Sequence, residues 1–586
     1  MKISTIKIIG LSALLLSSNV FAVTCTSNSN PSDNCTDLVL SNPSSEITIP
    51  IGVTVSKNVS FAIEIPSGTT TTSLVNNGTL SGGLQNVIRV DGRIETFNNI
   101  GGITNTGSAA ISLRYSTSSI GTIINSGSIY AGNGQGILLY PDSQITTITN
   151  TGSIDSGVSG KFSIESRNPS ATASITNLNN SYNALTYSGN LPTNYNIIVN
   201  SDSAYGKLIY TNNDSYLAGT TTFGIYAGSL ITSRLYTGVL QSLADGNVGA
   251  TRTGSYDGMS WTLAISSGTS WDLTFSGVSL TQTQSSLASH ARKLSGTLNI
   301  ASLISHYPNS ATYDCNLFDV KGMCISAGGR YSTVDNPSTN SSAAVVTLGY
   351  KVNSNIRIGG FLDQSVTNNN PTGIDISNKH PMMGAFAYWN QQPDGLGYQV
   401  KVANAYQDKD LSTTRDVIGL SEAGRGSTSL NSRSYVSELS YAFMYKENTL
   451  VRPYFALRYT TIEQDAYTET GVSTPLTYSA INNRTTSALM GVKFKHALTP
   501  KANLIGSLGV EQDLHHKTDR LTATGIAGLT SENLSSDLHR TRPVASLGAT
   551  YDIAKTQRLS GEVLVQQLPF QNTAGATAYF NYMIGF

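Results

Sequence analysis

The chain has 586 residues, with 36 basic and 36 acidic side chains, and only 12% of its residues are charged. The zero net charge excludes a basic nucleic-acid-binding protein, and the length requires more than one hydrophobic core. Hydrophobic residues make up 39% of the chain, which with 54 Gly and 29 Tyr favours β-rich structure with many tight turns.

Residues 1–22 have the composition of a secretory signal peptide. Two lysines precede a short apolar run over residues 8–16, and Val20-Phe21-Ala22 places small residues at positions 20 and 22, where signal peptidase requires them. The run is too short for a membrane anchor, which needs about 18 apolar residues. We therefore expect export.

The four cysteines form two local pairs, Cys25 with Cys35 and Cys315 with Cys324. Disulfides are the default in an oxidising compartment, and near-neighbour pairing is the simplest of the three possible connectivities. A metal site is the weaker interpretation, because no His lies near either pair.

A short motif recurs between residues 23 and 200. It consists of an apolar residue, an Asn, a small polar residue, a Gly and a further apolar residue, and it predicts a right-handed β-helix or β-solenoid with one copy per coil. In this interpretation the Asn-x-Gly turn can take a left-handed conformation, and the stacked Asn side chains can bond along the ladder. The alternative is a Ser/Thr/Asn-rich linker. The copies are centred on Asn76, Asn105, Asn125 and Asn150, with a degenerate copy at Asn177.

Residues 201–278 contain two short alternating runs on either side of Ser266-Ser267-Gly268, which predict a hairpin that caps the solenoid.

A helix is then predicted from Thr281 to Ser305, long enough to cross a bilayer. Its polar side carries Gln284, Ser289, Arg292, Lys293 and Asn299, so it could cross only inside another structure. Its apolar stripe is formed by Leu287, Ala291, Leu294, Leu298 and Ala301.

Twelve runs of alternating polarity follow from Met323 onward. Short turns such as Asn353-Ser354 and Thr499-Pro500 alternate with long polar loops such as 367–380, 416–426 and 521–537, which is typical of an outer-membrane β-barrel. The runs are centred near Ala327, Val346, Gly359, Phe386, Val402, Leu439, Leu457, Met490, Leu508, Leu547, Val563 and Tyr582.

The alternation within these runs predicts apolar residues outside and charges in the lumen, where the charges pair with one another, with water or with the helix. A soluble sandwich would alternate in the same way with its apolar face inward. The last strand favours the barrel, because Phe580, Tyr582, Ile584 and Phe586 would leave an exposed aromatic edge on a soluble protein. The charges placed in the lumen are Arg330, Arg357, Asp363, Glu438, Arg458, Lys493, Glu511 and Glu562.

In this order, the segments resemble a type V secretion autotransporter, and the segments 313–316, 328–331 and 582–586 carry the resemblance best. The resemblance implies a signal peptide (1–22), a β-solenoid passenger (23–200), a capping or autochaperone-like segment (201–278), a pore-traversing helix (279–308) and a β-barrel (309–586). It also implies outer-membrane lipid, periplasmic chaperones and the barrel-assembly machinery as partners. That machinery would recognise Phe580, Tyr582, Ile584 and Phe586.

Some members of that family release their passenger through paired asparagines in the pore helix. The helix predicted here carries Asn299 alone, with no Asn-Asn pair. We therefore expect a passenger that stays tethered to the cell.

Catalytic groups are sparse in the passenger. Residues 23–280 contain no His, which removes Ser-His-Asp and Cys-His catalysis and imidazole metal sites from it. Asp142, Asp155 and Glu165 could act on a polysaccharide, although isolated turn carboxylates are the favoured interpretation. A cluster of Asp513, His515, His516 and His539 could hold a metal, but we favour exposure at a barrel loop. We expect no cofactor, no metal and no nucleic-acid partner.

Adhesion or self-association through the solenoid is the leading functional hypothesis, because a repetitive flank favours multivalent weak binding to a surface ligand or another copy. The alternative is a carboxylate-dependent polysaccharide hydrolase or lyase carried by the same barrel. A third hypothesis, a porin-like channel, predicts ion conductance that the helix would reduce.

Overall fold

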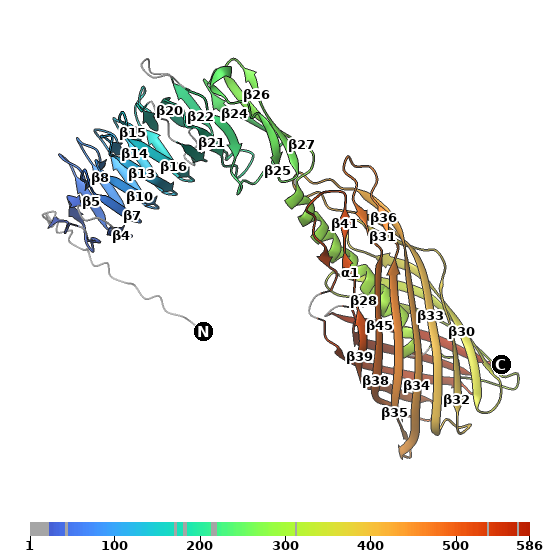
Figure 1. The fold of residues 1–586 in the computed structure, drawn as a ribbon. Helices are drawn as coiled ribbons and strands as arrows, with labels where there is room; N and C mark the ends of the chain where they lie inside the picture. Colours follow the sequence, from blue (N-terminus) through green and yellow to red (C-terminus); the bar gives the residue numbers. More distant parts are fainter. Residues whose placement is uncertain are drawn as a thin grey trace, which may run out of the picture. The chain divides into compact units, whose positions relative to one another are not determined.

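The computed structural model describes residues 23–27, 29–40, 45–168, 173–179, 184–211, 219–310, 313–535, 538–570 and 573–586. The predicted signal peptide lies outside these residues. The described chain contains one α-helix, one short 3₁₀ turn (Asp245–Asn247) and 45 strands, and it divides into two compact units (Figure 1). The first unit comprises residues up to Tyr256 with Ser260–Ser276, and the second comprises Asp257–Met259 with Gly277–Phe586.

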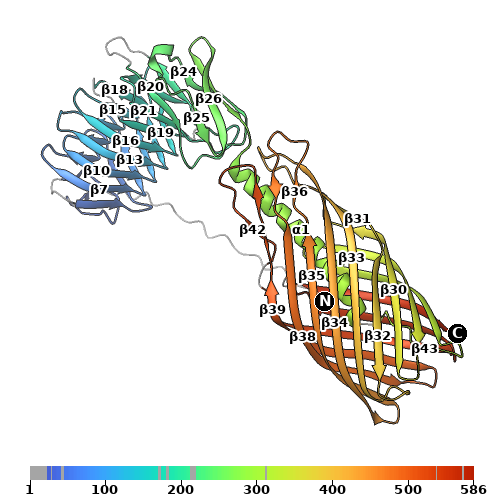
Figure 2. The ribbon, with the colours of Figure 1, turned by 45° about the vertical axis from the view of Figure 1, so that its right-hand side comes forward.

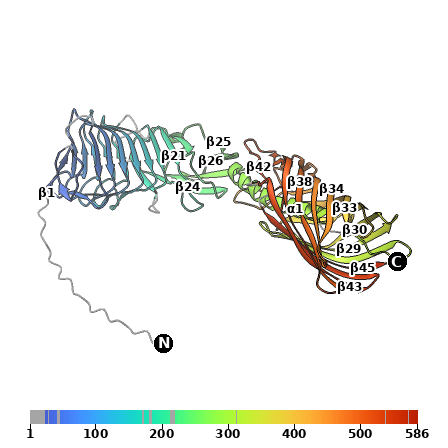
Figure 3. The same ribbon diagram turned by 90° about the horizontal axis from the view of Figure 1, so that it is seen from below.

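The first unit is a parallel β-solenoid of about seven turns with three sheets, and its coils are seen stacked side by side in Figure 3. The first sheet contains β1 (Val23–Thr24), β2 (Cys35–Thr36), β5 (Thr54–Lys57), β8 (Thr79–Gly82), β11 (Gly102–Asn105), β14 (Ser128–Ala131) and β17 (Ser153–Ser156). The second contains β4 (Ser45–Ile49), β7 (Thr70–Asn76), β10 (Arg93–Asn99), β13 (Ser119–Asn125), β16 (Gln144–Asn150), β19 (Ser174–Asn177), β21 (Asn194–Ile197) and β23 (Thr222–Ile225).

The third sheet begins with nine short parallel strands and continues into the cap. The parallel strands are β3 (Leu38–Val39), β6 (Ile63–Ile65), β9 (Ile88–Val90), β12 (Ile111–Leu113), β15 (Ile137–Leu139), β18 (Ile164–Ser166), β20 (Leu185–Gly189), β22 (Leu208–Thr211) and β24 (Leu235–Gln241). The cap strands are β25 (Thr253–Tyr256), β26 (Met259–Ser267) and β27 (Ser270–Ser276).

The predicted cap is present, because β26 and β27 form an antiparallel hairpin and β27 pairs with the last parallel strand, β24. The solenoid nevertheless extends past residue 200, since β21 still pairs in parallel with β23, and β22 with β24. The reason is a continuous buried column in the second sheet in which aromatic rings replace the aliphatic residues of the motif. The column runs Ile47, Leu74, Phe97, Ile123, Ile148, Ile175, Tyr195 and Phe223.

A ladder of buried Asn side chains runs through the solenoid, as the motif predicted, but with one different member. Asn99, which is followed by Ile100-Gly101, stands on the ladder in place of Asn105. Asn105 instead ends β11 in another sheet and bonds the carbonyls of Gln85 and Ala109. Each amide Nδ2 on the ladder donates to the Oδ1 of the next coil at 2.7 to 2.9 Å, in the order Asn76, Asn99, Asn125, Asn150 and Asn177.

The glycines of the motif serve close packing and do not adopt the left-handed conformation that we expected. Gly78, Gly101, Gly127 and Gly152 have no positive φ. A Cβ placed on Gly101 would lie 2.0 Å from the carbonyl oxygen of Gly78, and one on Gly127 would lie 2.0 Å from that of Gly101. Each of these coils therefore needs Gly at the corner, because the backbone of the previous coil occupies the space of a side chain.

The second unit is a closed antiparallel barrel whose twelve strands correspond to the twelve predicted runs (Figure 2). β28 pairs with both β29 and β45, and β33 pairs with β34, which closes the ring. The strands are β28 (Met323–Val334), β29 (Thr339–Lys351), β30 (Ile356–Asn369), β32 (Met382–Asn390), β33 (Gly397–Thr414), β34 (Arg425–Lys446), β35 (Thr449–Gln464), β38 (Ile481–Ala497), β39 (Ala502–Lys517), β43 (Thr541–Ala554), β44 (Gln557–Gln567) and β45 (Ala574–Gly585).

The long loops at one end of the barrel contain short strands, and the predicted short turns lie at the other end. β31 (Ile374–Asn378) pairs with the far part of β33. Two small sheets are formed by β36 (Tyr467–Thr468), β37 (Thr477–Tyr478) and β41 (Ala523–Thr524), and by β40 (Arg520–Leu521) and β42 (Glu532–Asn533).

The single helix α1 (Leu280–Ser310) lies inside the barrel and packs on the inner faces of β28, β29, β33, β34, β35 and β45 (Figure 2). Its 31 residues span about 46 Å at ~1.5 Å per residue. Within the described residues, no helix has both the length and the apolarity that a membrane-spanning helix requires.

Candidate functional site: the helix-filled barrel lumen

The barrel wall is apolar outside and polar inside. On β34, Leu439, Tyr441 and Phe443 are 40 to 50% exposed, whereas the alternate residues Glu438 and Ser440 are buried. A membrane barrel has this polarity, because its outer face contacts lipid and its lumen contacts water or protein. The same alternation in the other strands makes the lumen the place where this unit concentrates its charges.

The outer end of α1 is capped by side chains on both sides of its first turn. Ser279 Oγ accepts from the backbone N–H of Gln282, and Asp257 accepts from the backbone N–H and the hydroxyl of Thr281, each at 2.9 Å. These bonds satisfy N–H groups that a helix end leaves without partners. The helix therefore begins at a fixed point, Leu280, close to the predicted Thr281.

The predicted apolar stripe of α1 is buried against the wall of the barrel. Leu287, Leu294 and Leu298 are at most 2% exposed and pack with Leu411, Ile462 and other residues of the strands and loops near the long-loop end. At Gly296 the helix comes so close to the loop after β28 that a Cβ would lie 2.5 Å from the ring of Pro337. The polar side of α1 is also enclosed, since His290, Asn299 and His306 are each 1% exposed.

Aromatic rings close the lumen at the other end of the helix. Tyr313 lies 4.9 Å from Tyr579, 5.0 Å from Phe361 and 5.4 Å from Tyr307, measured between ring centroids. Leu303 and other apolar side chains fill the space around them. A helix with aliphatic packing at one end and aromatic packing at the other fills the lumen.

Ion pairs line the wall around the helix. Arg330 donates to both oxygens of Asp363 at 2.7 and 3.0 Å, and both side chains are fully buried. Arg458 lies 2.8 Å from Glu511, and Lys493 lies 2.5 Å from Glu438. Six of the eight charges predicted in the lumen therefore pair with one another.

The other two predicted charges have different surroundings. Arg357 pairs with Asp314 at 2.7 Å, outside the predicted set. Glu562 is half-buried beside Ser546 and has no ion pair among the residues that the structure describes.

Sequence reasoning missed two central members of this network. Arg542 lies 3.0 Å from Glu511 and 2.6 Å from Asp513, and all three side chains are at most 1% exposed. Our expectation that Asp513 lies at an exposed loop is therefore wrong, because it is an inward residue of β39. The alternation of inward and outward residues in β43 could have indicated that Arg542 faces the lumen. The neighbouring Pro543 made that alternation hard to recognise.

The long loops hold the helix at its outer end. Gln284 and Thr530 exchange two hydrogen bonds of 3.0 and 2.9 Å, and Lys293 Nζ lies 2.6 Å from the carboxylate of Asp416. Ser289 donates to the same carboxylate at 2.8 Å. At its outer end the helix is therefore bonded to the loops by polar side chains of its first turns.

Next to this contact lies a buried ion pair within the loops. Arg415 donates to both oxygens of Glu469, at 2.5 and 2.9 Å, and Tyr478 donates to the same carboxylate at 2.9 Å. Arg415 also donates to Ser286 of α1 at 3.2 Å. The loops therefore close over the helix through a charged, fully hydrogen-bonded centre.

The last strand and the cysteines have defined places. Phe580, Tyr582 and Ile584 share the outer face of β45, with Phe580 66% exposed, and Phe586 follows directly after the strand. The backbones of Phe586 and Met323 bond to each other. The structure pairs Cys25 with Cys35 and Cys315 with Cys324. The second disulfide ties the segment after α1 to the start of β28.

The candidate carboxylates of the passenger are not gathered. Asp142 lies in a turn with φ of 66°, Asp155 lies in β17 of the first sheet, and Glu165 lies in β18 of the third. Glu165 is 7% exposed and accepts from Arg167 at 2.6 Å, so it is not the solvated turn carboxylate that we expected.

His516 lies 3.0 Å from Asp513. Among the described residues no group of three or more His, Cys, Asp or Glu side chains is placed to hold a metal ion.

Comparison with known proteins agrees with this geometry. Residues 325–563 match the family described as Autotransporter beta-domain. The chain is 34% identical over 95 residues to the neisserial autotransporter lipoprotein NalP of Neisseria meningitidis serogroup B. That match covers 16% of this chain and only 9% of the relative, so the chain spans a small part of the curated relatives it matches.

Solved structures of three translocator units are also similar. The NalP translocator domain from Neisseria meningitidis shows 19% identity and a TM-score of 0.37, over 46% of this chain and 90% of that one. The BrkA β-domain of Bordetella has 13% identity and a TM-score of 0.32, over 46% and 100%. The AIDA-I transport unit of Escherichia coli has 11% identity and a TM-score of 0.33, over 51% and 99%.

The barrel, with its matched residues 325–563, belongs to the family of autotransporter β-domains. This barrel lies in the outer membrane, and the β-solenoid of the chain is displayed at the cell surface.

Proposed function

We propose that the displayed solenoid serves adhesion or self-association. The observation that carries the proposal is a row of outward hydroxyl groups in register on five adjacent strands of the second sheet, from β7 to β19. All are half-exposed, and none has a side-chain hydrogen bond among the residues that the structure describes. The row is formed by Ser73, Thr96, Thr122, Thr147 and Ser174.

Neighbouring strands in a sheet lie about 4.8 Å apart, so the row repeats one hydrogen-bonding group at that interval. Each group contributes little alone, but several binding at once to a repetitive ligand or to a second copy raise the overall affinity strongly. Such a row supports a binding function without a catalytic centre.

The separation of the passenger carboxylates supports binding over catalysis. Polysaccharide hydrolysis requires two carboxylates facing one bond at a distance below ~10 Å. Asp142, Asp155 and Glu165 lie in a turn and in two different sheets. Replacing each by its amide and assaying a panel of polysaccharides tests this point, and loss of a measurable hydrolytic activity would favour the enzyme hypothesis.

The binding proposal is tested by placing charge on the row. Thr122→Lys together with Thr147→Lys is expected to reduce cell attachment or aggregation at least fivefold at equal surface level. The matched control, Thr104→Lys with Ser128→Lys, places the same charge on exposed positions of the first sheet. Equal loss in both variants would contradict a role for this row.

We also propose that the passenger stays tethered. α1 includes Asn309 as well as Asn299, and the two asparagines are not adjacent. Immunoblots of washed cells should show one band of mature length, and a released fragment of the passenger's size would refute tethering.

We propose that the assembly signal consists of the outward β45 residues Phe580, Tyr582 and Ile584 together with Phe586, which follows the strand. Deletion of Phe586 should lower the amount of barrel in the outer membrane, and normal surface levels would refute this role.

A further inference from the structure

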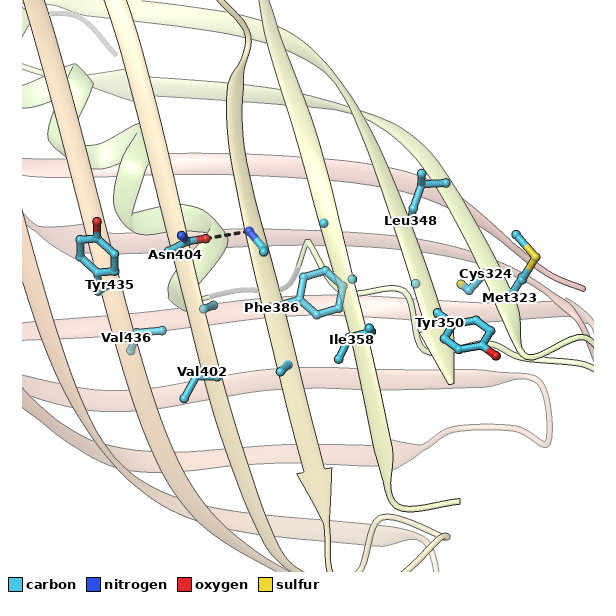
Figure 4. A pocket seen from close by; sticks show the side chains of 16 residues that line it. Met323, Cys324, Leu348, Tyr350, Ile358, Phe386, Val402, Asn404, Tyr435 and Val436 are labelled. Atoms are coloured by element: carbon cyan, nitrogen blue, oxygen red, sulfur yellow. Dashed lines mark hydrogen bonds between the residues drawn. The ribbon is translucent and has the colours of Figure 1, made fainter. Parts of the chain in front are cut away.

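The outer wall of the barrel has a hollow where its outward side chains become small. On neighbouring strands the lipid-facing positions are Gly360, Ala385 and Ala387, whereas Leu348 and Tyr435 on the flanking strands are 54% and 48% exposed. The resulting groove has a volume of about 750 Å³ (Figure 4). A second hollow of about 600 Å³ shares Gly360 and Ala385 and extends the groove to Tyr406.

One polar residue lies within this apolar groove. Asn404 shares the outer face of β33 with Val402, and its Oδ1 accepts from the backbone N–H of Ala385 at 2.7 Å (Figure 4). At this point the pairing of β32 with β33 is interrupted, so the side chain replaces a missing backbone partner. The Nδ2 of Asn404 has no hydrogen bond among the described residues. An unpaired amide donor is costly in hydrocarbon, and an acceptor supplied by a ligand would remove that cost.

The position of Asn404 sets the depth of the groove in the membrane. Asn404 is seven residues beyond Gly397, where β33 begins at the short-turn end. Seven residues at ~3.3 Å each and a tilt of about 40° correspond to a height of roughly 18 Å, and the apolar band of such barrels is about 25 Å tall. Asn404 therefore lies in the half of the band nearer the long loops, which is the outer leaflet.

An exposed arginine lies next to the groove on the side of the long loops. Arg433 pairs in register with Tyr406, and its guanidinium lies 5.6 Å from the centre of the Tyr406 ring. It is exposed and forms no ion pair within the described chain. Nearby, Lys379 lies 3.8 Å from Asp408. The exposed guanidinium of Arg433 complements an anionic headgroup.

We propose that this groove binds a phosphorylated, acylated lipid of the outer leaflet. One acyl chain lies on Gly360, Ala385 and Ala387, the ester carbonyl at its head accepts from Asn404 Nδ2, and the phosphate contacts Arg433. The groove, the amide and the cation follow one another in the order in which chain, ester and phosphate occur in such a lipid.

The full-length protein, extracted and delipidated in mild detergent, tests the proposal by native mass spectrometry. It is titrated with bis-phosphorylated lipid A and, separately, with the same lipid after removal of its phosphates. The wild-type protein should bind the phosphorylated lipid at least tenfold more tightly. Arg433→Gln should abolish that preference, and Ala385→Leu, which fills the groove, should weaken binding of both lipids at least tenfold.

Lys446→Gln is the matched control, because Lys446 is an exposed cation at the opposite end of the same strand as Arg433. Folding of each variant is checked by the mobility of the unheated barrel on gels. Unchanged lipid binding in Arg433→Gln and Ala385→Leu would overturn the proposal. A dimer of the wild-type chain that Ala385→Leu disrupts would also overturn it, since a second copy would then occupy the groove.

Discussion

In the solenoid, a row of buried neutral amides bonds from coil to coil, whereas in the barrel buried charges pair with one another around a helix. Asn125, for example, contacts the same type of residue in the coil before and the coil after it. Glu511, by contrast, lies between Arg458 and Arg542, which come from two other strands. The solenoid repeats one type of hydrogen bond, and the barrel combines several different ion pairs.

The difference follows from what surrounds each interior. Every coil of the solenoid meets an almost identical coil, so one residue type that both donates and accepts can satisfy the whole row. The barrel wall encloses a helix and has no repeat, so each buried charge needs an opposite charge at its own place. A substitution in the amide row should therefore weaken several neighbouring coils of the solenoid. A substitution in the ion network should have a large effect that is confined to its own part of the barrel.

The largest expected effect tests the barrel side of this comparison. Glu511→Gln leaves Arg458 and Arg542 without their shared carboxylate and should destabilise the barrel by about 3–5 kcal/mol. The measurement is the temperature at which the barrel loses its compact mobility on gels. Glu447→Gln, in an exposed turn, is the control and should leave that temperature unchanged. Equal stability of the two variants would mean that the ion network contributes nothing.

The next effect tests the amide row. Asn99→Ala removes the ladder acceptor of Asn76 Nδ2 and the donor to Asn125 Oδ1, which should cost about 2–6 kcal/mol at ~1–3 kcal/mol for each group. The neighbouring Asn98 points outward, so Asn98→Ala should change stability by less than about 0.5 kcal/mol. Hydrogen exchange of the backbone amides in β10 and β13 measures both. Similar exchange in the two variants would refute the ladder's role.

A similar neighbouring pair tests the glycine corner. Gly101→Ala places a methyl group against the carbonyl of Gly78 and should cost about 1–3 kcal/mol. At Gly102 the nearest atom to an added Cβ is Ser128 Oγ at 3.6 Å, so Gly102→Ala should be tolerated. The thermal unfolding temperature of the passenger distinguishes the two variants. Equal unfolding temperatures would show that the coils can move apart to accept the methyl group.

The smallest effect concerns the loop that holds the helix. The hydrogen bond from Lys293, and then that from Ser289, hold the pKa of the Asp416 carboxyl below its usual value. Its stabilising contact is therefore complete above the unfolded pKa of about 3.9 and is lost as the pH falls through the lower folded value. Asp416→Asn should weaken the contact at neutral pH by less than about 1 kcal/mol.

Planar-bilayer recordings measure this contact as brief openings of the plugged barrel. The wild-type protein should open more often at pH 3 than at pH 7, and Asp416→Asn should open at both. Asp375→Asn, at an exposed position of β31, is the control. If the frequency of openings does not depend on pH, the ionised Asp416 does not contribute to keeping the barrel closed.

The sequence was informative wherever polarity alternates without interruption, which is why all twelve barrel strands and the helix stripe were predicted. It failed where a residue's role depends on its neighbour in space. Asn99 was missed because the residue between it and its glycine is Ile100, where the motif has a polar residue. The end of the solenoid was missed because Tyr195 and Phe223 fill a column begun by aliphatic residues. The pairing of charges in the lumen depends on how the barrel closes, and the sequence of a single strand does not contain that information.

The amide row also has a direction. Each Nδ2 from Asn76 to Asn177 donates toward the following coil, and the last one donates to the hydroxyl of Tyr195 at 3.3 Å. The Oδ1 of Asn76, at the start, has no hydrogen-bond partner within the described residues. The side-chain dipoles therefore add in one sense, as peptide dipoles do in a helix. The solenoid thus carries a partial negative charge buried at its first coils and a partial positive charge near its cap.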